Sequence, residues 1–271
     1  QVEYIVQKAK GLAINIHPLG AISKKTAGTD LSEMYDMQQS GAIAFSDGIH
    51  PVQSAGLVLK ALQYVKSFEG TIIQLPDDTS IGANGLMNEG IISTQMGLPG
   101  KPILAEELMV ARDLKLARYA NSKIHFTGIS SPKSIEYIKR SKESGIQVTC
   151  SITPYQVYFC DEDLQGYDTN LKLNPPLRTR ADMEAIQKAL LDGTIDCIAS
   201  HHLPHHWDNK VCEFEYARHG MIALETMFAV LMSCGLPAKD FVQMQTINVR
   251  NIFGLSIPEI KEGETASLTL F

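Results

Sequence analysis

Short apolar runs alternate with longer amphipathic segments along most of the chain. The apolar runs have strand length and end in polar or Gly/Pro-containing loops, whereas the longer segments repeat apolar residues every three or four positions. This alternation is typical of parallel βα architecture. It predicts strands at residues 12–17, 42–46, 71–75, 123–127, 147–152 and 195–200. It predicts helices at residues 52–66, 105–119, 131–144, 180–191 and 221–234.

The number of strand–helix units indicates that the chain is incomplete. About six units are visible, which is too few to close an eight-stranded (β/α)₈ barrel with sequential connections. The first residue is Gln1, and residues 260–271 begin a new alternating pattern where the sequence stops. We therefore expect both ends to be cut, with two units missing if the fold is a TIM-type barrel.

The composition indicates which kinds of binding partner and which cellular compartment are expected. The net charge is −6 and the 24 Lys and Arg residues are scattered, so a nucleic-acid role has little support. The five cysteines are odd in number and form no C-x-x-C pair, which favours reduced thiols in a cytoplasm. We expect neither a membrane span nor a signal peptide, because no apolar run approaches membrane-spanning length and the first residues lack a charged-then-apolar pattern. The chain is expected to be cytoplasmic, with a small molecule or another protein as its partner.

Four histidines follow the predicted strand at residues 195–200, where α/β folds place their chemistry. His201, His202, His205 and His206 include i, i+4 spacing and could bind a transition metal through neutral imidazole. The same residues could instead form a substrate-binding loop, or a loop that only caps the strand. Zinc needs three or four well-placed donors. The histidines alone therefore leave these three interpretations open.

Three other positions have both a functional and a structural interpretation. Asp47, before Gly48, could be a metal ligand or general base, or could cap the following turn. His125 lies inside a predicted strand and is either a functional or a core histidine. Asn174 begins a segment that two prolines make rigid, which suits presentation to a ligand but also an ordinary loop.

Several of these segments together resemble the dihydroorotases of the amidohydrolase superfamily, and the resemblance covers essentially the whole chain. Its most specific markers are Asn-Pro-Pro-Leu-Arg at 174–178 and Asp-Gly-Thr-Ile-Asp-Cys-Ile-Ala at 192–199, together with Phe-Ser-Asp-Gly at 45–48 and His-x-Pro-His at 202–205. The resemblance implies an α/β, (β/α)₈ TIM-type barrel with a small β-sandwich made from both chain ends. Residues 1–258 would then supply about strands 3 to 8, and residues 259–271 the start of the sandwich.

The resemblance also implies an activity and a set of site residues. The family interconverts N-carbamoyl-L-aspartate and dihydroorotate in pyrimidine biosynthesis, using one or two zinc ions to activate water. Its metal-ligand positions fall on Gly48, Leu75, Gly128 and His201, of which only His201 keeps a donor atom. The family's His-x-His strand is not in this chain. Asp47 and His201 are the candidate catalytic residues, with His201 the candidate metal ligand. Its substrate positions fall on Asn174, His205, His219 and Gly220.

Three hypotheses follow from this ligand set. The favoured one is a homologue that has lost its metals and acts as a binding or assembly partner, as some family members do beside aspartate transcarbamoylase. The second is an active cyclic amidohydrolase with a remodelled mononuclear zinc site. The third is a small-molecule sensor of dihydroorotate or carbamoyl-aspartate. A homo-oligomer is expected from the family in each case.

Overall fold

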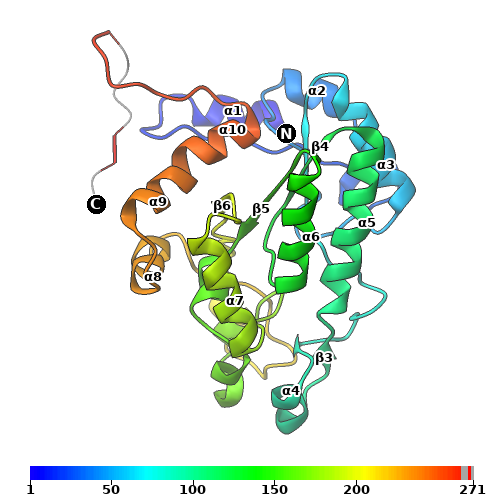
Figure 1. The fold of residues 1–271 in the computed structure, drawn as a ribbon, viewed down its shortest axis with the longest axis vertical. Coiled ribbons are helices and arrows are strands. Elements are labelled where there is room, and N and C mark those ends of the chain that lie inside the picture. Colours follow the sequence, from blue (N-terminus) through cyan, green and yellow to red (C-terminus); the bar gives the residue numbers. More distant parts are fainter. Residues whose placement is uncertain (264–267, 270–271) are drawn as a thin grey trace.

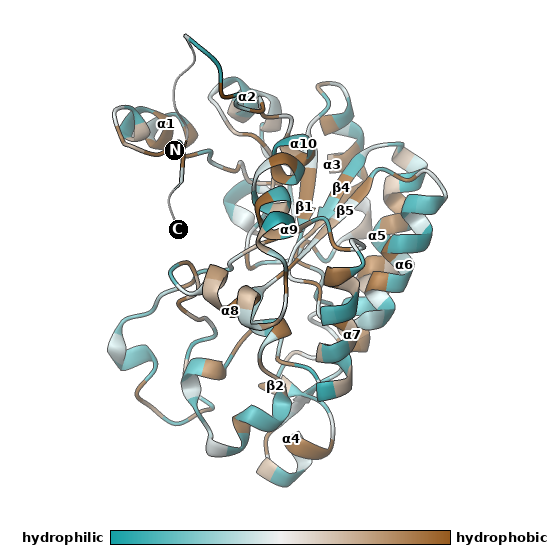
Figure 2. Cartoon of the chain, turned by 60° about the vertical axis from the view of Figure 1, so that its left-hand side comes forward, coloured by the Kyte–Doolittle hydropathy of each residue, from teal (hydrophilic) through white to brown (hydrophobic). Residues whose placement is uncertain are grey.

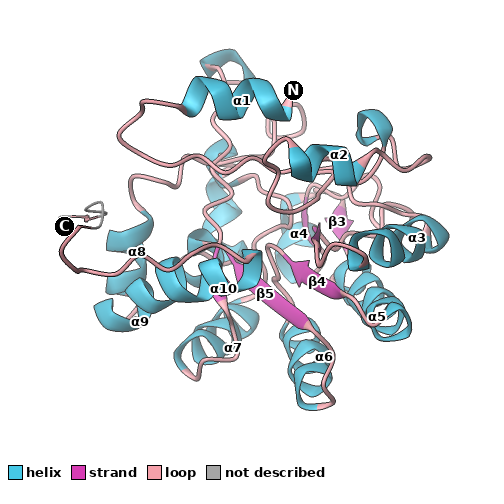
Figure 3. Ribbon diagram, turned by 90° about the horizontal axis from the view of Figure 1, so that it is seen from above, coloured by secondary structure: helices cyan, strands magenta, loops and turns pink. Residues whose placement is uncertain are grey.

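The computed structural model describes residues 1–263 and 268–269, and its centre is a curved parallel sheet. The sheet has the order β1 (Thr71–Gln74), β4 (Lys123–Phe126), β5 (Val148–Ile152) and β6 (Cys197–Ile198), with every neighbouring pair parallel. Parallel bridges from Phe45 to Gly20 and to Ile72 extend it beyond β1. Seen from above, helices lie around the outside of these strands (Figure 3). This arrangement is an arc of a βα barrel.

The covering helices follow the order of the strands (Figure 1). They are α3 (Ala55–Lys66), α5 (Leu104–Ala120), α6 (Pro132–Glu143) and α7 (Arg180–Leu191). An excursion between β1 and α5 holds β2 (Met87–Asn88), α4 (Ile91–Met96) and β3 (Gly100–Lys101). The remaining helices are α1 (Val2–Ala9), α2 (Met34–Gln39), α8 (Met227–Ser233), α9 (Ala238–Gln243) and α10 (Val249–Phe253). Short 3₁₀ turns lie at Lys24–Thr26, Pro154–Val157, Asp161–Gly166, Thr169–Leu171 and Trp207–Asn209, with a π-helical turn at Met244–Asn248.

Amphipathic patterning and caps explain why these helices form. The Ser54 side chain accepts a hydrogen bond from the Leu57 amide at the start of α3, and Ser131 caps α6 in the same way. The covering helices carry both hydrophobic and hydrophilic positions (Figure 2), and α3 buries an apolar face that includes Leu62 and Val65. This burial against the sheet holds the carboxyl ends of the strands in place.

Most predicted elements are confirmed, and the differences lie in loops. Strands are present within 71–75, 123–127, 147–152 and 195–200, and the helix predicted at 180–191 has the bounds of α7. The segment 42–46 joins the sheet only through bridges at Phe45. The helix predicted from residue 221 begins at Met227, because Met221 is bridged to His202 instead.

The strand predicted at residues 12–17 is wrong. Leu12, Ile14 and Ile16 are 54%, 67% and 42% exposed, and the ladder contact of this region lies farther along, at Gly20. An alternating apolar pattern forms a strand only where a neighbouring strand and a core face are available to it.

The sandwich segment predicted at 259–271 remains a prediction, because residues 264–267 and 270–271 lie outside the described part and the described residues there form no strand. In the part of the chain that the structure describes, no helix is both long and apolar enough to cross a membrane.

Candidate functional site

Three of the four candidate metal positions meet beyond the carboxyl ends of β1, β4 and β6. A Cβ atom built on Gly128 would lie 2.6 Å from His201 Cε1 and 3.3 Å from Leu75 Cδ1, and Gly128 has a positive φ of 71°. The His201 ring therefore fills the space that a side chain at position 128 would need. Gly48 faces open space, with no heavy atom within 4 Å of its would-be Cβ.

His201 is the donor-bearing member of this set, and its environment favours the neutral form. Its Nε2 is hydrogen-bonded to Thr127 Oγ1 at 2.7 Å. Burial lowers the pKa of His201 to about 4, so the ring is uncharged at neutral pH. Within residues 1–263 and 268–269, no three His, Cys, Asp or Glu side chains converge as metal ligands would. These residues do not fit a binuclear zinc centre.

His201 belongs to a chain of hydrogen bonds that crosses the interior of the sheet. Ser151 Oγ donates to Thr127 Oγ1 at 3.1 Å, and Ser151 is also hydrogen-bonded to His125 Nε2 at 3.1 Å. The chain continues from His125 Nδ1 to Thr149 Oγ1 at 2.8 Å. Burial lowers the pKa of His125 to about 3. His125 is therefore a core histidine with both ring nitrogens paired, which matches the structural interpretation of this residue.

Asp47 is buried, and its carboxylate binds the neighbouring segment. Asp47 Oδ1 accepts from the Ile22 and Ser23 amides at 2.8 and 2.9 Å, and Oδ2 accepts from the Ser23 hydroxyl. This role is structural, but it is not the predicted cap of the following turn, because the carboxylate binds amides of the earlier segment around Ile22. A catalytic role for Asp47 stays a prediction, and these contacts do not favour it.

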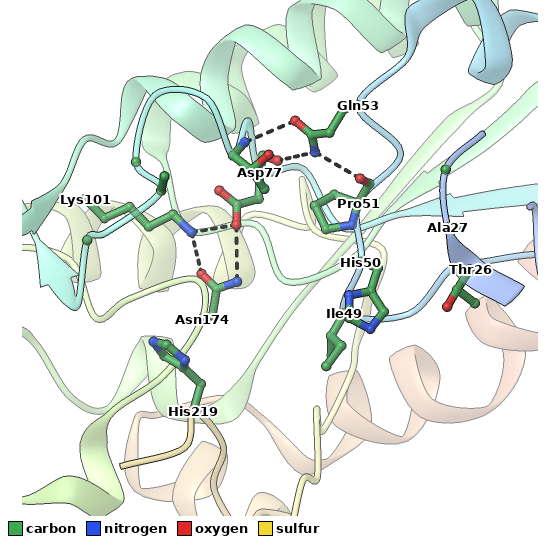
Figure 4. Close-up of a pocket in the computed structure, with 15 residues that line it drawn as sticks. Thr26, Ala27, Ile49, His50, Pro51, Gln53, Asp77, Lys101, Asn174 and His219 are labelled. Atoms are coloured by element: carbon green, nitrogen blue, oxygen red, sulfur yellow. Dashed lines mark hydrogen bonds and ion pairs between the residues drawn. The ribbon is translucent and has the colours of Figure 1, made fainter. Parts of the chain in front are cut away.

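A cavity of about 540 Å³ lies on the same side of the sheet. Segments around Thr26, His50 and Asp77 line it together with Lys101, Asn174 and His219. In Figure 4, Lys101, Asp77 and Asn174 form one hydrogen-bonded cluster, with His219 beside it and His50 across the open space. The cavity is within the size range of small-molecule sites.

Three side-chain hydrogen bonds hold the cluster of Lys101, Asp77 and Asn174 together. Lys101 Nζ donates to Asp77 Oδ2 at 2.5 Å and to Asn174 Oδ1 at 2.8 Å. Asn174 Nδ2 donates to the same Asp77 oxygen at 3.2 Å. Asp77 is 7% exposed, so this carboxylate is desolvated and depends on these partners. Sequence reasoning missed both Asp77 and Lys101. Asp77 lies two residues after the predicted strand 71–75, which is a usable signal, whereas nothing in the sequence marks Lys101.

The predicted substrate positions divide between two cavities. Asn174 and His219 line the first, whereas His205 and Gly220 line a second cavity of about 690 Å³ with mainly aromatic and aliphatic walls. His205 Nε2 is hydrogen-bonded to the His219 carbonyl at 2.8 Å. A Cβ atom on Gly220 would lie 2.7 Å from the Leu203 carbonyl oxygen, and φ is 143°, so only glycine fits. The segment through His219 and Gly220 thus separates the two cavities.

The loop that carries His205 and His219 is held by a buried lysine. Lys172 is 2% exposed, and its Nζ donates to the Phe214 and Glu215 carbonyls at 2.6 and 2.9 Å. Its own carbonyl accepts from the Gly220 amide at 3.0 Å. Burial is the main cause that lowers the pKa of His219 to about 4, and the positive charges of Lys172 and Lys101 lower it further. The His219 imidazole therefore faces the first cavity in its neutral form.

Comparison of the sequence with protein families gives two matches. The model described as dihydro-orotase-like matches residues 1–134, and the model of the amidohydrolase family matches residues 83–271. The dihydroorotase of Acetivibrio thermocellus is 40% identical over 275 residues, covering 99% of this chain and 65% of the relative. The dihydroorotase of Syntrophus aciditrophicus is 39% identical, covering 99% of this chain and 64% of the relative. The chain thus spans slightly less than two thirds of these curated relatives, and the predicted resemblance is confirmed.

Solved structures show the same fold at low sequence identity. An L-hydantoinase (dihydropyrimidinase) from Arthrobacter aurescens matches with a TM-score of 0.77 and 19% identity, covering 94% of this chain and 60% of that one. A D-hydantoinase (dihydropyrimidinase) from Thermus sp. matches with a TM-score of 0.65 and 16% identity, covering 74% and 47%. These matches support the predicted α/β barrel architecture for the part of it that this chain forms.

Proposed function

Because the chain belongs to the amidohydrolase family and its curated relatives are dihydroorotases, we propose that it is a metal-depleted, non-catalytic dihydroorotase homologue of pyrimidine biosynthesis. In this proposal it acts as a binding or assembly partner rather than as a hydrolase. Aspartate transcarbamoylase is the proposed protein partner, and a cytoplasmic homo-oligomer is the proposed state. The five free cysteines are consistent with that compartment.

The observation that carries the proposal is the packing of His201 against Gly128, with Leu75 on another side of the same glycine. Zinc hydrolysis of a cyclic amide needs several ligands around one ion that lowers the pKa of bound water and polarises the carbonyl. Here one imidazole occupies the space beside the glycine, and its Nε2 is already bound to Thr127. A leucine and a glycine supply no donor atom. This donor set supports the proposal that the described residues do not hold a catalytic zinc ion.

The experiment measures metal and turnover on the same protein. The protein is purified without chelators after growth with added zinc, and metal is quantified by plasma mass spectrometry. We expect no stoichiometric zinc and no cyclisation of N-carbamoyl-L-aspartate. About one zinc per chain, with turnover that disappears in His201→Ala, would establish the mononuclear enzyme instead. His206→Ala is the matched control, because His206 lies exposed in the same loop.

A second candidate function, a small-molecule sensor, is favoured by the first cavity. Asn174 and His219 line that cavity, and both fall on substrate positions of the family. Calorimetric titration with dihydroorotate and with carbamoyl-aspartate tests it. Saturable binding without turnover supports the sensor, and the absence of binding of either compound contradicts it.

A further inference from the structure

The second cavity plays no part in the proposed function. It has a volume of about 690 Å³, and most of the side chains that line it are aromatic or aliphatic. We propose that this cavity binds a neutral, flat aromatic molecule, and that it does so independently of the first cavity. The inference goes beyond the proposed function, because it needs neither a metal ion nor a ligand in the first cavity.

The side of the second cavity at His205 and Gly220 is a wall shared with the first cavity. The His219 carbonyl is an acceptor, so His205 Nε2 donates the hydrogen bond between them. The Gly220 amide donates to the Lys172 carbonyl at 3.0 Å, and a Cβ atom on Gly220 would lie 2.7 Å from the Leu203 carbonyl oxygen. The groups that form this wall are thus bonded to one another or tightly packed. Binding in the second cavity must come from its other walls.

Aromatic side chains reach the second cavity from two separate segments. Tyr155, Tyr158 and Phe159 follow β5, whereas Trp207 lies in the loop after β6. The rings of Tyr158 and Phe159 pack edge to face, with centroids 4.8 Å apart and planes at 81°. Stacked or edge-to-face aromatic pairs contribute about 0.5–1.5 kcal/mol beyond the burial of their area. These walls therefore favour a flat aromatic ring system over an aliphatic chain.

Several of the apolar side chains around this cavity are largely exposed. Trp207, the one tryptophan of the sequence, is 73% exposed, Val211 and Ile222 are each 58% exposed, and Tyr158 is 49% exposed. Exposed apolar side chains that gather in one place mark binding sites, whereas scattered ones need no explanation. Here they gather around a cavity in the size range of small-molecule sites. The occupant that we infer is therefore a small molecule.

The charged groups of the cavity favour a neutral ligand. Among the described residues that line it, Lys210 is the one lysine or arginine and Asp168 the one acidic residue. Lys210 Nζ donates to the Thr169 and Arg218 carbonyls, both at 2.8 Å, and Asp168 Oδ1 accepts from the Asn170 amide at 2.9 Å. An anionic ligand would lose its hydration and meet a lysine that already binds two carbonyls. A neutral aromatic molecule does not have this cost.

The experiment uses Trp207 as a local reporter. N-phenylnaphthylamine, a neutral aromatic dye that accepts excitation energy from tryptophan, is titrated into the protein as purified. We expect about one dye to bind per chain, with a dissociation constant of about 10 µM or tighter. Transfer from the one tryptophan should be nearly complete, because Trp207 lines the cavity. No saturable binding, or saturable binding with weak transfer from Trp207, would overturn the proposal.

Two further titrations test the charge and the place of the ligand. Anilinonaphthalene sulfonate has the same ring system with one added anionic group, and it should bind at least about tenfold more weakly than the neutral dye. Equal or tighter binding of the sulfonate would contradict a neutral ligand class. Neither dihydroorotate nor carbamoyl-aspartate should displace the neutral dye. Displacement by either compound would place the dye in the family's substrate site and overturn the inference.

A charge placed on the wall tests whether the dye occupies this cavity. Ile222→Asp should weaken binding of the neutral dye at least about tenfold, because it adds a carboxylate to an apolar wall. Ile91→Asp is the matched control, since Ile91 is 76% exposed and lines neither cavity. Equal losses in the two variants, or no loss in Ile222→Asp, would overturn the proposal, with thermal melts to verify folding. If Ile222→Asp does not fold, Val211→Asp takes its place with the same expected loss.

Discussion

At the scale of single residues, the candidate metal site depends on two positions whose side chains are complementary in size. Gly128 has no side chain and a left-handed backbone, and the His201 ring packs into the space that results. In the sequence alone, the glycine at 128 and the histidine at 201 look like two unrelated changes at metal-ligand positions of the family. The structure explains the two residues together, because the position of the His201 ring depends on its contact with Gly128, 73 positions earlier in the chain. Neither residue identity nor spacing predicts such a contact.

Gly128→Ala is expected to destabilise the fold by about 2 kcal/mol, because its Cβ atom would lie 2.6 Å from His201 Cε1. Gly145→Ala is the control: it has a similar positive φ of 81° but no atom within 4 Å, so it should cost only about 1 kcal/mol. Urea unfolding measures both. Adding His201→Ala should remove the excess cost of Gly128→Ala, and strictly additive effects would contradict the contact.

At the scale of elements, the sequence predicts best where one segment alone decides the structure. Strands β1, β4 and β5 are short and mostly buried, and α3, α6 and α7 each begin at a side-chain cap. Prediction failed for residues 12–17, where the outcome depends on a neighbouring strand. The cavity cluster could not be predicted for a related reason. Lys101 reaches Asp77 only because β3 pairs with β2 in the excursion between β1 and α5.

The cap at Ser131 gives a prediction for α5 and α6 together. Its hydroxyl oxygen accepts from the Lys133 amide at 3.1 Å, and the hydroxyl donates to Glu107 on α5 at 2.7 Å. Ser131→Ala should therefore cost about 1–2 kcal/mol of stability, measured by urea or thermal unfolding. Ser144→Ala, at the exposed end of the same helix, should change stability by less than about 0.5 kcal/mol. Similar losses in the two variants would show that the cap does not join the helices.

At the scale of the whole molecule, the alternating pattern was sufficient to predict a parallel arc with helices outside it. It could not place the functional side chains, because residues 77, 101, 174 and 219 meet only when separate loops fold over one end of that arc (Figure 4). Stability on this scale depends on polar groups buried inside the arc. His125 joins β4 to β5 through Thr149 and Ser151, and its ring also packs against Phe253 of α10.

The buried neutral state of His125 predicts a loss of stability in acid. Its pKa falls from 6.5 to about 3 on folding, so the unfolded chain binds the extra proton between these values. The stability that neutral His125 contributes to the free energy of unfolding is fully present above pH 6.5. It is lost as the pH falls below that value, at about 1.4 kcal/mol per pH unit. Unfolding free energies from pH 6.5 to 5 should decrease less steeply in His125→Gln than in wild type. A slope equal to that of the exposed-site control His206→Ala would contradict this assignment.

The hydrogen-bonded chain from Thr149 to His201 couples the proton positions of two imidazoles. When Ser151 donates to Thr127, an unbroken chain has Thr127 donating to His201 Nε2 and His125 Nε2 donating to Ser151. His201 then carries its proton on Nδ1. Reversing every hydroxyl gives the only other unbroken arrangement, in which both histidines are the opposite tautomer. The two rings therefore switch tautomer together, and a group that binds one nitrogen of His201 selects the state of His125 deep inside the sheet.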